Sequence, residues 1–314
     1  MCNVRQSGCP DQSKDNSSPA GFPAYTAGMK LQSSDSDALH RFLDTHARVA
    51  VLTGAGISAP SGIPTYRDRD GVWRHAEPIK HQEFLTDPAR RRRYWARSLL
   101  GWPAVRDAQP NAAHLALATL ERAGRLALLI TQNVDRLHQR AGSRKVVDLH
   151  GRLDRVRCVD CAAIFPREGI QGELARSGGC MENAIIGQRP DGDAEVADDL
   201  IRQIREPGCT VCGALLMPDV VFFGGTVPRE RVQACMRAVE QADALIVIGS
   251  SLQVYSGFRF CRRAAELGKP LALINPGKTR ADPIADLKLR SDCGPLLQRV
   301  AGRYKHLAKR PPAA

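Results

Sequence analysis

The sequence lacks long hydrophobic runs. None of its apolar stretches approaches the ~20 residues that a membrane-spanning helix needs, and residues 1–30 contain no apolar segment of the kind found in secretory signals. Both observations argue against a membrane protein and against a secreted one. We therefore expect no membrane partner and a cytoplasmic location, or the mitochondrial matrix if the source is eukaryotic.

Aromatic residues are also scarce, at 5% of the chain, and no interleaving of aromatic and basic residues suggests a base-stacking surface. The net charge of +12 by itself invites a nucleic-acid interpretation. However, the excess is mostly arginine spread along the chain, and its densest run, Arg90–Arg93, is typical of a solvated helix face. The charge favours acidic ligands or partners, and we expect no specific nucleic acid. A non-enzymatic zinc ribbon that binds nucleic acid is the alternative.

Ten cysteines could form disulfides, but a long chain without a signal peptide argues for a reducing compartment. Four of them form two C-x-x-C pairs, Cys158 with Cys161 and Cys209 with Cys212. Four thiolates make a closed tetrahedral zinc site, which stabilises a fold and leaves no position for a reactive water. The 47 residues between the pairs exceed the usual spacing, and a redox C-x-x-C or unrelated thiols are the alternatives. We predict one structural zinc ion.

Apolar strands that alternate with helices indicate the fold class. The strands are apolar over their whole length, so both faces of the sheet must be covered. This pattern predicts an α/β protein with a Rossmann-like parallel sheet, helices on both faces and a small zinc-binding domain. The expected helices span 35–47, 87–100, 111–124, 229–241 and 258–268. The expected strands are the run before Gly54, 126–131, 145–151, 220–225 and 269–277, and residues 242–252 are expected to form a strand and a turn.

Two segments interrupt this alternation. Residues 62–110 are rich in Arg, Pro and Trp, and residues 156–212 contain both cysteine pairs with an acidic, Gly/Pro-rich insert. From these features we expect three parts. They are a disordered segment at 1–34, a Rossmann-like domain made of 35–155 and 213–314, and a small zinc-binding module at 156–212 that the helical excursion 62–110 joins.

A glycine-rich turn follows the first strand. Gly54, Gly56 and Ala59 form a G-x-G-x-x-A pattern. In such a turn the second glycine lets a pyrophosphate approach, and the small third residue packs a helix against the strand. A plain tight turn is the alternative. No second strand ending in a ribose-binding acid follows, and Gly62 and Pro64 instead begin a rigid loop that can close over a ligand. This combination favours group transfer at a nucleotide over hydride transfer.

Polar residues follow the next two strands. Gln132, Asn133 and Asp135 come directly after one predicted strand, and His150 follows the next. Because ligands bind beyond the carboxyl ends of parallel strands, we expect these side chains to meet the glycine turn. Amides and carboxylates can bind ribose hydroxyls or a carboxamide, and a neutral imidazole can act as a general base. A purely structural role is the alternative for His150.

The order of these motifs resembles the sirtuin family. The matching segments are "GAGISAPSGIPTYR", "TQNVDRLHQRAG", "LHG", "MPDVVFFGGTVP", "GSSLQ" and "INPG", and the resemblance covers roughly residues 35–300. "YWARSLLGWP", "QPNAAHLAL" and the late Cys293 most resemble the class II branch, which contains the fourth human sirtuin and bacterial relatives. The resemblance implies an NAD-dependent protein-lysine deacylase with NAD as co-substrate and one structural zinc ion.

The resemblance also implies roles for individual residues. His150 would be the general base, with Asn133 and Asp135 beside it at the nicotinamide end. An acyl-lysine protein or peptide would add as a β-strand to a segment that includes Val220, Phe222, Phe223 and Gly224. The residues implied for NAD are Gly54, Ala55, Gly56, Ile57, Ser58, Pro64, Tyr66, Arg67, Trp73, Gln132, Asn133, Val134, Asp135, Gly249, Ser250, Ser251, Asn275, Pro276, Gly277 and Cys293.

The implied reaction consumes NAD. The acyl-lysine oxygen attacks C1′ of the nicotinamide ribose, and nicotinamide leaves. His150 then helps the ribose 2′-hydroxyl to attack the imidate carbon, and water completes the sequence to free lysine and O-acyl-ADP-ribose. A protein mono-ADP-ribosyltransferase that uses the same NAD site is the alternative. The sequence leaves the protein targets and the oligomeric state unspecified.

Two residues bear on the identity of the acyl group. Tyr94 and Arg97 lie at i and i+3 of a predicted helix and so share a face. The resemblance implies that such a pair binds the distal carboxylate of an acidic acyl chain, with the guanidinium as a fork and the phenol as a second donor. A surface helix within an Arg-rich run is the alternative. The class II resemblance also allows bulkier lipoyl- or glutaryl-like chains.

Overall fold

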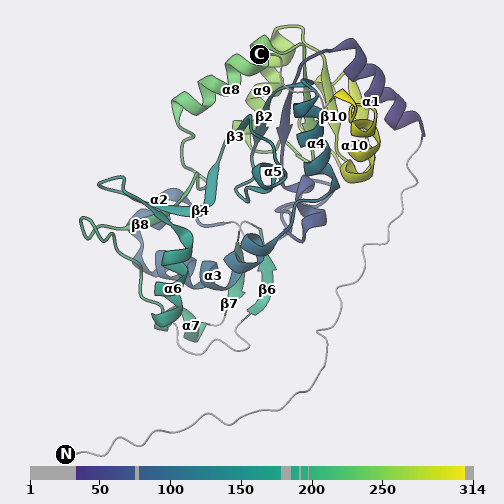
Figure 1. The fold of residues 1–314 in the computed structure, drawn as a ribbon. Helices are drawn as coiled ribbons and strands as arrows, with labels where there is room; N and C mark the ends of the chain where they lie inside the picture. The colour runs from purple at the N-terminus through teal and green to yellow at the C-terminus, as the bar shows by residue number, and fades with distance from the viewer. Residues whose placement is uncertain (1–32, 75–77, 178–184, 191, 197, 308–314) are drawn as a thin grey trace, which may run out of the picture. The chain divides into compact units, whose positions relative to one another are not determined.

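Six parallel strands form the central sheet. They are β1 (Val49–Thr53), β2 (Leu126–Thr131), β3 (Val146–Asp148), β9 (Ala244–Ile248), β10 (Leu271–Ile274) and β11 (Leu287–Leu289). Their order is β11-β10-β9-β1-β2-β3, with every neighbouring pair parallel. The chain adds β2 and β3 on one side of β1 and later adds the other three strands on the opposite side (Figure 1). The strand order therefore reverses between β1 and β9.

The computed structural model describes residues 33–74, 78–177, 185–190, 192–196 and 198–307. The expected disordered segment at 1–34 lies outside these residues, except for its last two, which begin the first helix. Within the described part of the chain, no helix combines the length and the apolar character needed to span a membrane.

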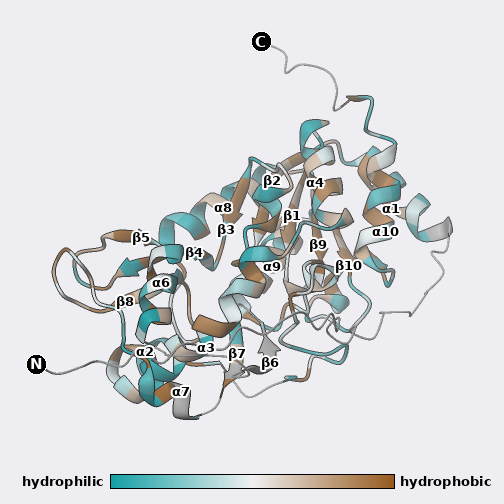
Figure 2. Ribbon diagram, turned by 60° about the horizontal axis from the view of Figure 1, so that its bottom comes forward, coloured by the Kyte–Doolittle hydropathy of each residue, from teal (hydrophilic) through white to brown (hydrophobic). Residues whose placement is uncertain are grey.

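Alternate residues of each strand belong to different hydrophobic cores. In β1, Val49 and Val51 belong to one core, whereas Ala50 and Leu52 belong to another on the opposite face. The same alternation recurs along β9 and β10. Because both faces are covered, every position of these strands is buried, which explains their uninterrupted apolar runs. Figure 2 shows the central strands coloured as hydrophobic.

Helices from distant parts of the chain cover the two faces. One face packs against α1 (Ser33–Thr45), α4 (Ala112–Arg122) and α10 (Cys293–Gly302), and the other against α8 (Arg229–Gln241) and α9 (Tyr255–Glu266). The short α5 (Leu137–Arg140) follows β2. The start of α4 is fixed by Asn111, whose side chain accepts a hydrogen bond from the Ala113 amide. The architecture confirms the predicted α/β class with helices on both faces.

The two interrupting segments share a further hydrophobic core. In this core, Trp95 from the first segment packs with Val156 and Leu174 from the second segment. Met217, which follows the second segment, belongs to the same core. Its elements include a three-stranded antiparallel sheet, β5-β4-β8. The elements are α2 (His81–Thr86), α3 (Pro88–Asp107), β4 (Gly151–Cys158), β5 (Ile164–Pro166), α6 (Arg167–Ser177), α7 (Asp198–Gln203), β8 (Leu216–Val220) and a hairpin of β6 (Ile185–Arg189) and β7 (Asp193–Val196).

The hairpin crosses α3 at a glycine. A Cβ on Gly101 would lie 2.5 Å from the backbone carbon of Asp193, and a Cβ on Gly192 would lie 3.2 Å from the Trp102 Cα. Such backbone contact is possible only where the helix carries no side chain. The long insert therefore contains regular structure that contacts the rest of the chain, which its acidic, Gly/Pro-rich sequence does not reveal.

The prediction for residues 220–225 was wrong. The strand there, β8, ends at Val220, and it pairs with β4 in the small sheet, not with the central one. Beyond it the chain turns, because Gly224 adopts φ +75° and the Gly225 amide donates to the Phe222 carbonyl. The domain boundary expected between residues 155 and 156 falls inside β4, so that strand runs through both expected parts.

Candidate active site

The turn after β1 and the turn after β9 are in direct contact where the strand order reverses. The Gly54 amide donates to the Ile248 carbonyl at 3.1 Å, and the Gly56 amide donates to the Gly249 carbonyl at 2.8 Å. A Cβ on Gly56 would lie 2.8 Å from the Gly249 oxygen, and a Cβ on Gly54 would lie 2.7 Å from the Ser250 Cβ. Both glycines are therefore required by this contact. Open α/β sheets bind their ligands at this position.

Ser58 links the loop after β1 to the loop after β2. Its hydroxyl donates to Asp135 Oδ2 at 2.7 Å and accepts from Asn133 Nδ2 at 3.0 Å. The same amide nitrogen donates to the Gly54 carbonyl at 3.1 Å. Burial raises the pKa of the Asp135 carboxyl, and hydrogen bonds from the Leu137 amide and from Ser58 oppose this shift. The predicted amide and carboxylate are thus fixed against the glycine turn.

Gln132 connects the loop after β2 to the loop after β9. Its Nε2 donates to Ser250 Oγ at 2.8 Å and to the Thr53 carbonyl at 3.3 Å. A Cβ on Gly257 would lie 2.6 Å from Gln132 Oε1, so the start of α9 approaches this amide as closely as a glycine allows. Three strand ends therefore meet around one polar cluster.

His150 follows β3 and is held at both ring nitrogens. Nδ1 lies 3.0 Å from the Gln132 carbonyl oxygen, which can only accept, so Nδ1 carries the proton. Nε2 then accepts from the Ser256 hydroxyl at 2.7 Å. Burial lowers the pKa of His150 to about 4, and the positive charges of Arg231 and Arg259 add to this shift. The imidazole is therefore neutral near pH 7, with its basic nitrogen directed at a hydroxyl group.

An aromatic cluster joins the loop after the glycine turn to the segment after β8. The rings of Tyr66, Trp73 and Phe223 contact one another edge to face, with centroids 5.6 to 6.0 Å apart. The Arg67 guanidinium lies 3.9 Å from the centre of the Trp73 ring and donates to the Gly71 carbonyl. The closing loop, residues 64–74, is thereby joined to the segment after β8.

The other end of the closing loop contacts the loop after β10. The Lys278 amide donates to the Arg69 carbonyl at 3.0 Å, and a Cβ on Gly277 would lie 2.3 Å from that same oxygen. Asn275 Nδ2 donates to the Gly277 carbonyl at 3.1 Å, which fixes the turn. The closing loop therefore extends from the β8 segment to the β10 loop.

The four cysteines of the two C-x-x-C pairs form one cluster. Their Sγ atoms all lie within 4.8 Å of one another. Cys158 and Cys212 are separated by 3.5 Å, and Cys161 and Cys209 by 3.7 Å. A tetrahedral zinc ion with Zn–S bonds of about 2.3 Å requires sulfur atoms about 3.8 Å apart. The cluster fits a closed Cys₄ zinc site, as predicted.

A model of the Sir2 family matches residues 54–256, which is more than half of the chain. The chain belongs to the Sir2 family. The NAD-dependent protein deacetylase of Xanthomonas campestris pv. campestris (strain 8004) is 50% identical over 260 residues, covering 83% of this chain and 89% of that protein. The mitochondrial NAD-dependent protein lipoamidase sirtuin-4 of Homo sapiens is 46% identical over 262 residues, covering 82% of this chain and 83% of that protein.

Solved Sir2 structures share the fold. A Sir2 homologue in complex with NAD is 35% identical, with a TM-score of 0.67 and coverage of 87% of this chain and 95% of its own. A Sir2 mutant bound to a p53 peptide and NAD is 32% identical, with a TM-score of 0.68 and coverage of 85% and 98%. The sequence-based assignment to the sirtuin family is confirmed.

Three residues predicted for the NAD site of this Sir2-family chain pack their side chains into or against hydrophobic cores. The side chains of Ile57 and Val134 are buried in hydrophobic cores, so only their backbones can face a ligand. Cys293 begins α10 and packs against a core, where burial raises its pKa to about 12. After the glycine turn the chain forms two short 3-10 helices, Ala55–Ile57 and Ala59–Ser61. Pro60 lies within the second of them.

The expected peptide-binding segment lies beside His150. The Val221 amide donates to the His150 carbonyl at 2.7 Å. The Phe223 carbonyl accepts from the His81 amide, so part of this backbone is paired within the chain. The Phe222 side chain turns inward and stacks on Phe84 with ring centroids 5.1 Å apart. The Phe222 side chain therefore anchors the segment to α2 and does not face a bound peptide.

The expected acyl-binding pair is occupied by the chain itself. The Tyr94 ring packs edge to face against Phe222. Arg97 forms an ion pair with Asp193 and donates to the Ala194 carbonyl at 2.9 Å, both from β7. The guanidinium fork thus already binds a carboxylate.

Sequence reasoning missed three residues of this Sir2-family site. Ser256 is the hydroxyl partner of His150 Nε2, His114 approaches Ser58, and Asp193 pairs with Arg97. Only His114 had a local signal, because a ring three residues after a helix-capping Asn can complete a capping box. The other two partners come from distant elements that no local pattern connects.

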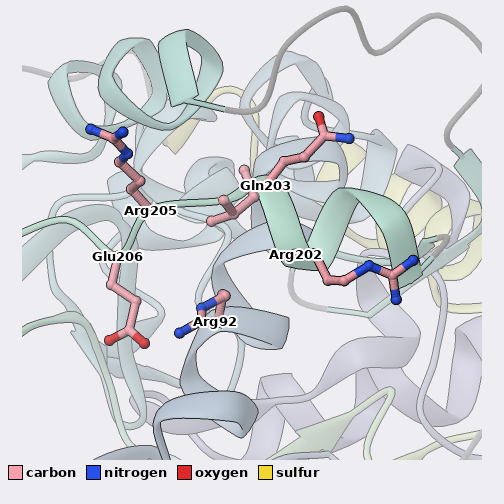
Figure 3. Close-up of a pocket in the computed structure, with 6 residues that line it drawn as sticks. Arg92, Arg202, Gln203, Arg205 and Glu206 are labelled. Carbon is pink, nitrogen blue, oxygen red and sulfur yellow. The ribbon is translucent and has the colours of Figure 1, made fainter.

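The arginine-rich run is only partly a solvated face. Arg91 is buried, pairs with Glu206 and donates to the Phe84 and Leu85 carbonyls. Next to it, a basic hollow opens between α3 and α7 (Figure 3). It is lined by Arg92, Arg202, Gln203, Ile204, Arg205 and Glu206, which are separate from the strand-end loops described above.

We predict that Cys158→Ser destabilises the protein through loss of zinc. Three thiolates do not complete the tetrahedral site, so bound zinc should fall well below one ion per chain and the Tm should drop by roughly 5–10 °C. Zinc content and thermal unfolding measure this. Cys235→Ser is the matched control, because that cysteine is buried in a core away from the cluster. A stable, metal-free Cys158→Ser protein would contradict the structural role.

We predict that His150→Ala reduces deacylation by about 10²- to 10⁴-fold while the Tm stays close to the wild-type value. For the wild type, the base must be neutral, so activity should persist below pH 6.5 and fall only as the pH approaches about 4. The unfolded chain binds this proton near pH 6.5, whereas the folded chain binds it only near pH 4. The free energy of unfolding therefore also decreases as the pH falls from 6.5 to about 4. Rates are therefore followed together with circular dichroism. A midpoint near pH 6.5 in a fully folded protein would disprove the lowered pKa.

Proposed function

We propose that this chain is an NAD-dependent protein-lysine deacylase, which transfers the acyl group to ADP-ribose and releases nicotinamide. The observation that carries this proposal is the neutral imidazole of His150, whose Nδ1 proton is fixed on a carbonyl and whose Nε2 faces a hydroxyl group. This base lies at the same edge of the sheet as the contact between the two turns. The named activity of the Xanthomonas relative supports the same chemistry.

The strand-end loops fit a dinucleotide. Glycine backbones, amides and hydroxyls converge after β1, β2 and β9, and such groups suit phosphates and ribose hydroxyls. The closing loop contacts both Phe223 and Lys278, so it can cover a long ligand from the base to the β10 loop and exclude water. When bound, NAD supplies the ribose carbon that receives the acyl oxygen.

His150 moves a proton at one defined atom. The Gln132 carbonyl keeps the proton on Nδ1, so Nε2 is the acceptor. In the structure the Ser256 hydroxyl occupies that acceptor, and it stands in for the hydroxyl group of a substrate. A ribose hydroxyl that replaced it would be deprotonated as it attacks.

The substrate is a protein or peptide that carries an acylated lysine. The segment after β8 supports this assignment, because the Val221 amide binds the His150 carbonyl and so couples peptide position to the base. The Sir2 structure with a bound p53 peptide supports a protein or peptide substrate. Mono-ADP-ribosyl transfer is the alternative reaction, and it requires the same NAD. No observation among the described residues favours it.

The test is an acyl-peptide panel with purified protein and labelled NAD. We expect nicotinamide release that depends on the acyl-peptide, with equal amounts of free lysine peptide and O-acyl-ADP-ribose by mass spectrometry. Stable label on protein without deacylated peptide would instead favour ADP-ribosyl transfer. Absence of nicotinamide release with every acyl group would reject the proposal.

The ion pair between Arg97 and Asp193 bears on acyl selectivity. The side chains are 17% and 28% exposed, so the pair is mostly shielded from water. We propose that Arg97 lies within reach of an acyl chain and that Asp193 neutralises it. An acidic acyl chain must then displace an internal carboxylate, whereas a neutral chain does not. Neutral acyl groups are therefore the preferred substrates.

We predict that Asp193→Asn raises the ratio of glutaryl to acetyl turnover, measured as kcat/KM, by about 3- to 10-fold. The gain should disappear in the Asp193→Asn, Arg97→Gln double variant, which no longer has the guanidinium. Asp198→Asn is the control, since this carboxylate is exposed on the neighbouring α7. An equal change for both acyl groups would show that the ion pair only supports the hairpin.

A further inference from the structure

An exposed tyrosine begins α9, directly before the residue that meets His150. Tyr255 is the first residue of this helix, and the hydroxyl of Ser256 after it lies 2.7 Å from His150 Nε2. A Cβ on Gly71 would lie 3.3 Å from Gln253 Nε2, so the closing loop contacts the chain just before the helix. Tyr255 itself is 46% exposed. The surface next to the base is therefore accessible at the start of α9.

Three guanidinium groups surround the Tyr255 ring. The guanidinium carbons of Arg259 and Arg262, both on α9, lie 5.3 and 5.9 Å from the ring centre, and that of Arg280, from the loop after β10, lies 6.0 Å away. Arg280 also lies 4.5 Å from the centre of the Phe258 ring. Because aromatic rings attract cations, the two rings bring three positive charges together on one small surface. We call Tyr255, Arg259, Arg262 and Arg280 the Tyr255 cluster.

The positive charge of the Tyr255 cluster is only partly neutralised by the described residues. Arg262 pairs with Glu266 at 3.2 Å, but both side chains are half-exposed, and exposed pairs of this kind contribute little. Neither Arg259 nor Arg280 forms an ion pair with a described carboxylate. Arg259 Nε is buried and has no hydrogen-bond partner among the described residues. Because like charges held close together repel one another, an anion that binds here supplies an interaction that this part of the chain lacks.

Arg259 links the Tyr255 cluster to the base. Burial lowers the pKa of His150, and the positive charge of Arg259 adds to this shift, so the guanidinium lies within electrostatic reach of the imidazole. In the proposed reaction the acyl group of the substrate must come close to His150. Neighbouring residues of a peptide are only about 3.8 Å apart from one Cα to the next, so those that flank the acyl-lysine pass near the start of α9.

We propose that the Tyr255 cluster binds an acidic side chain that flanks the acyl-lysine of the substrate protein. This inference rests on the proposed deacylase function and narrows its substrate class to proteins with Asp or Glu close to the modified lysine. Guanidinium groups bind carboxylates through charge-assisted hydrogen bonds. The Tyr255 hydroxyl accepts from Arg262 Nη1 at 3.0 Å, and its own proton can be donated to the same carboxylate.

The shape of the Tyr255 cluster favours a carboxylate over a nucleic acid. Its guanidinium groups converge on one ring, which suits a single acidic side chain. A nucleic acid instead needs a row of basic residues along its phosphates.

A set of matched peptides tests this proposal. They share one acyl-lysine and differ only in the two residues on each side, which are glutamate, glutamine or lysine. Every peptide has the same neutral acyl group, so the ion pair between Arg97 and Asp193 affects all of them equally. At an ionic strength of about 0.02 M we expect the wild-type KM to be about 3- to 10-fold lower for the glutamate peptide than for the glutamine peptide, with kcat within about twofold. At about 0.5 M salt this difference should fall below about twofold.

The variants are made at Arg280, because the charge of Arg259 also affects His150. Arg280→Gln should reduce the preference for glutamate by about threefold, Arg280→Glu should remove it, and Arg280→Lys should retain most of it because the charge remains. The NAD KM and the Tm should stay at their wild-type values. Arg299→Gln is the matched control, since it removes the same charge from an exposed position of α10, on the opposite face of the central sheet.

Several outcomes would overturn the proposal. Equal wild-type KM values for the three peptides would do so, and so would an equal loss of preference in Arg280→Gln and Arg299→Gln. A loss of preference that comes with a higher NAD KM or a lower Tm in all three Arg280 variants would assign the residue to the fold or to the NAD site. A short duplex DNA that binds the wild type but not Arg280→Gln, with equal turnover of all peptides, would assign the surface to nucleic acid.

Peptide binding separates this inference from the proposed function. The Kd of each acyl-peptide is measured by fluorescence anisotropy without NAD. If the wild type binds the glutamate peptide most tightly but deacylates none of the peptides, the proposed reaction is rejected and the docking surface stands. If it deacylates all of them with equal KM and Kd values, only the docking surface is rejected. A wild-type protein that binds no acyl-peptide would overturn both.

Discussion

The contact between the turn after β1 and the turn after β9 is the constraint on which the site depends. Two backbone hydrogen bonds and two glycines bring these turns together where the strand order reverses. Gln132 then reaches Ser250 across this contact, and Ser58 reaches Asp135 on its other side. A side chain at either glycine would separate the turns and remove the common reference for these bonds. Positions in the site are therefore set by backbone packing before any ligand arrives.

Two buried imidazoles show how the backbone assigns chemical roles. Burial lowers the pKa of both His114 and His150 to about 4, so neither ring carries charge near pH 7. Their Nδ1 atoms meet opposite backbone groups, an N–H of Asn111 for the first and the C=O of Gln132 for the second. The first ring is consequently a donor at Nε2, and the second is an acceptor there. The neutral imidazole therefore donates a hydrogen bond at His114 and can accept a proton at His150.

The insert between the cysteine pairs is part of the fold around the site. Its hairpin contacts α3 at Gly101, where only a glycine allows the backbones to meet, and Asp193 pairs with Arg97 one turn earlier. The Cys₄ cluster lies at the two ends of the segment that carries the hairpin. Zinc and hairpin therefore constrain the same segment, one at its ends and the other along its length. Through Tyr94 and Phe222, the helix α3 is also in contact with the proposed peptide-binding segment.

The sequence by itself determined the local features of this protein. Apolar strands of uniform character indicated a sheet covered on both faces, and the paired cysteines indicated a metal site. The family motifs indicated His150 and the loops around it. The strand at 220–225 was mispredicted because an apolar run does not reveal which sheet it joins or where a glycine turns the chain.

Only the tertiary structure decided the partners of the site residues. Ser256 meets His150 across 106 residues, and Asp193 meets Arg97 across 96. Periodicity, capping and turn chemistry act over a few residues, whereas these contacts depend on how whole elements pack, and no local pattern encodes that.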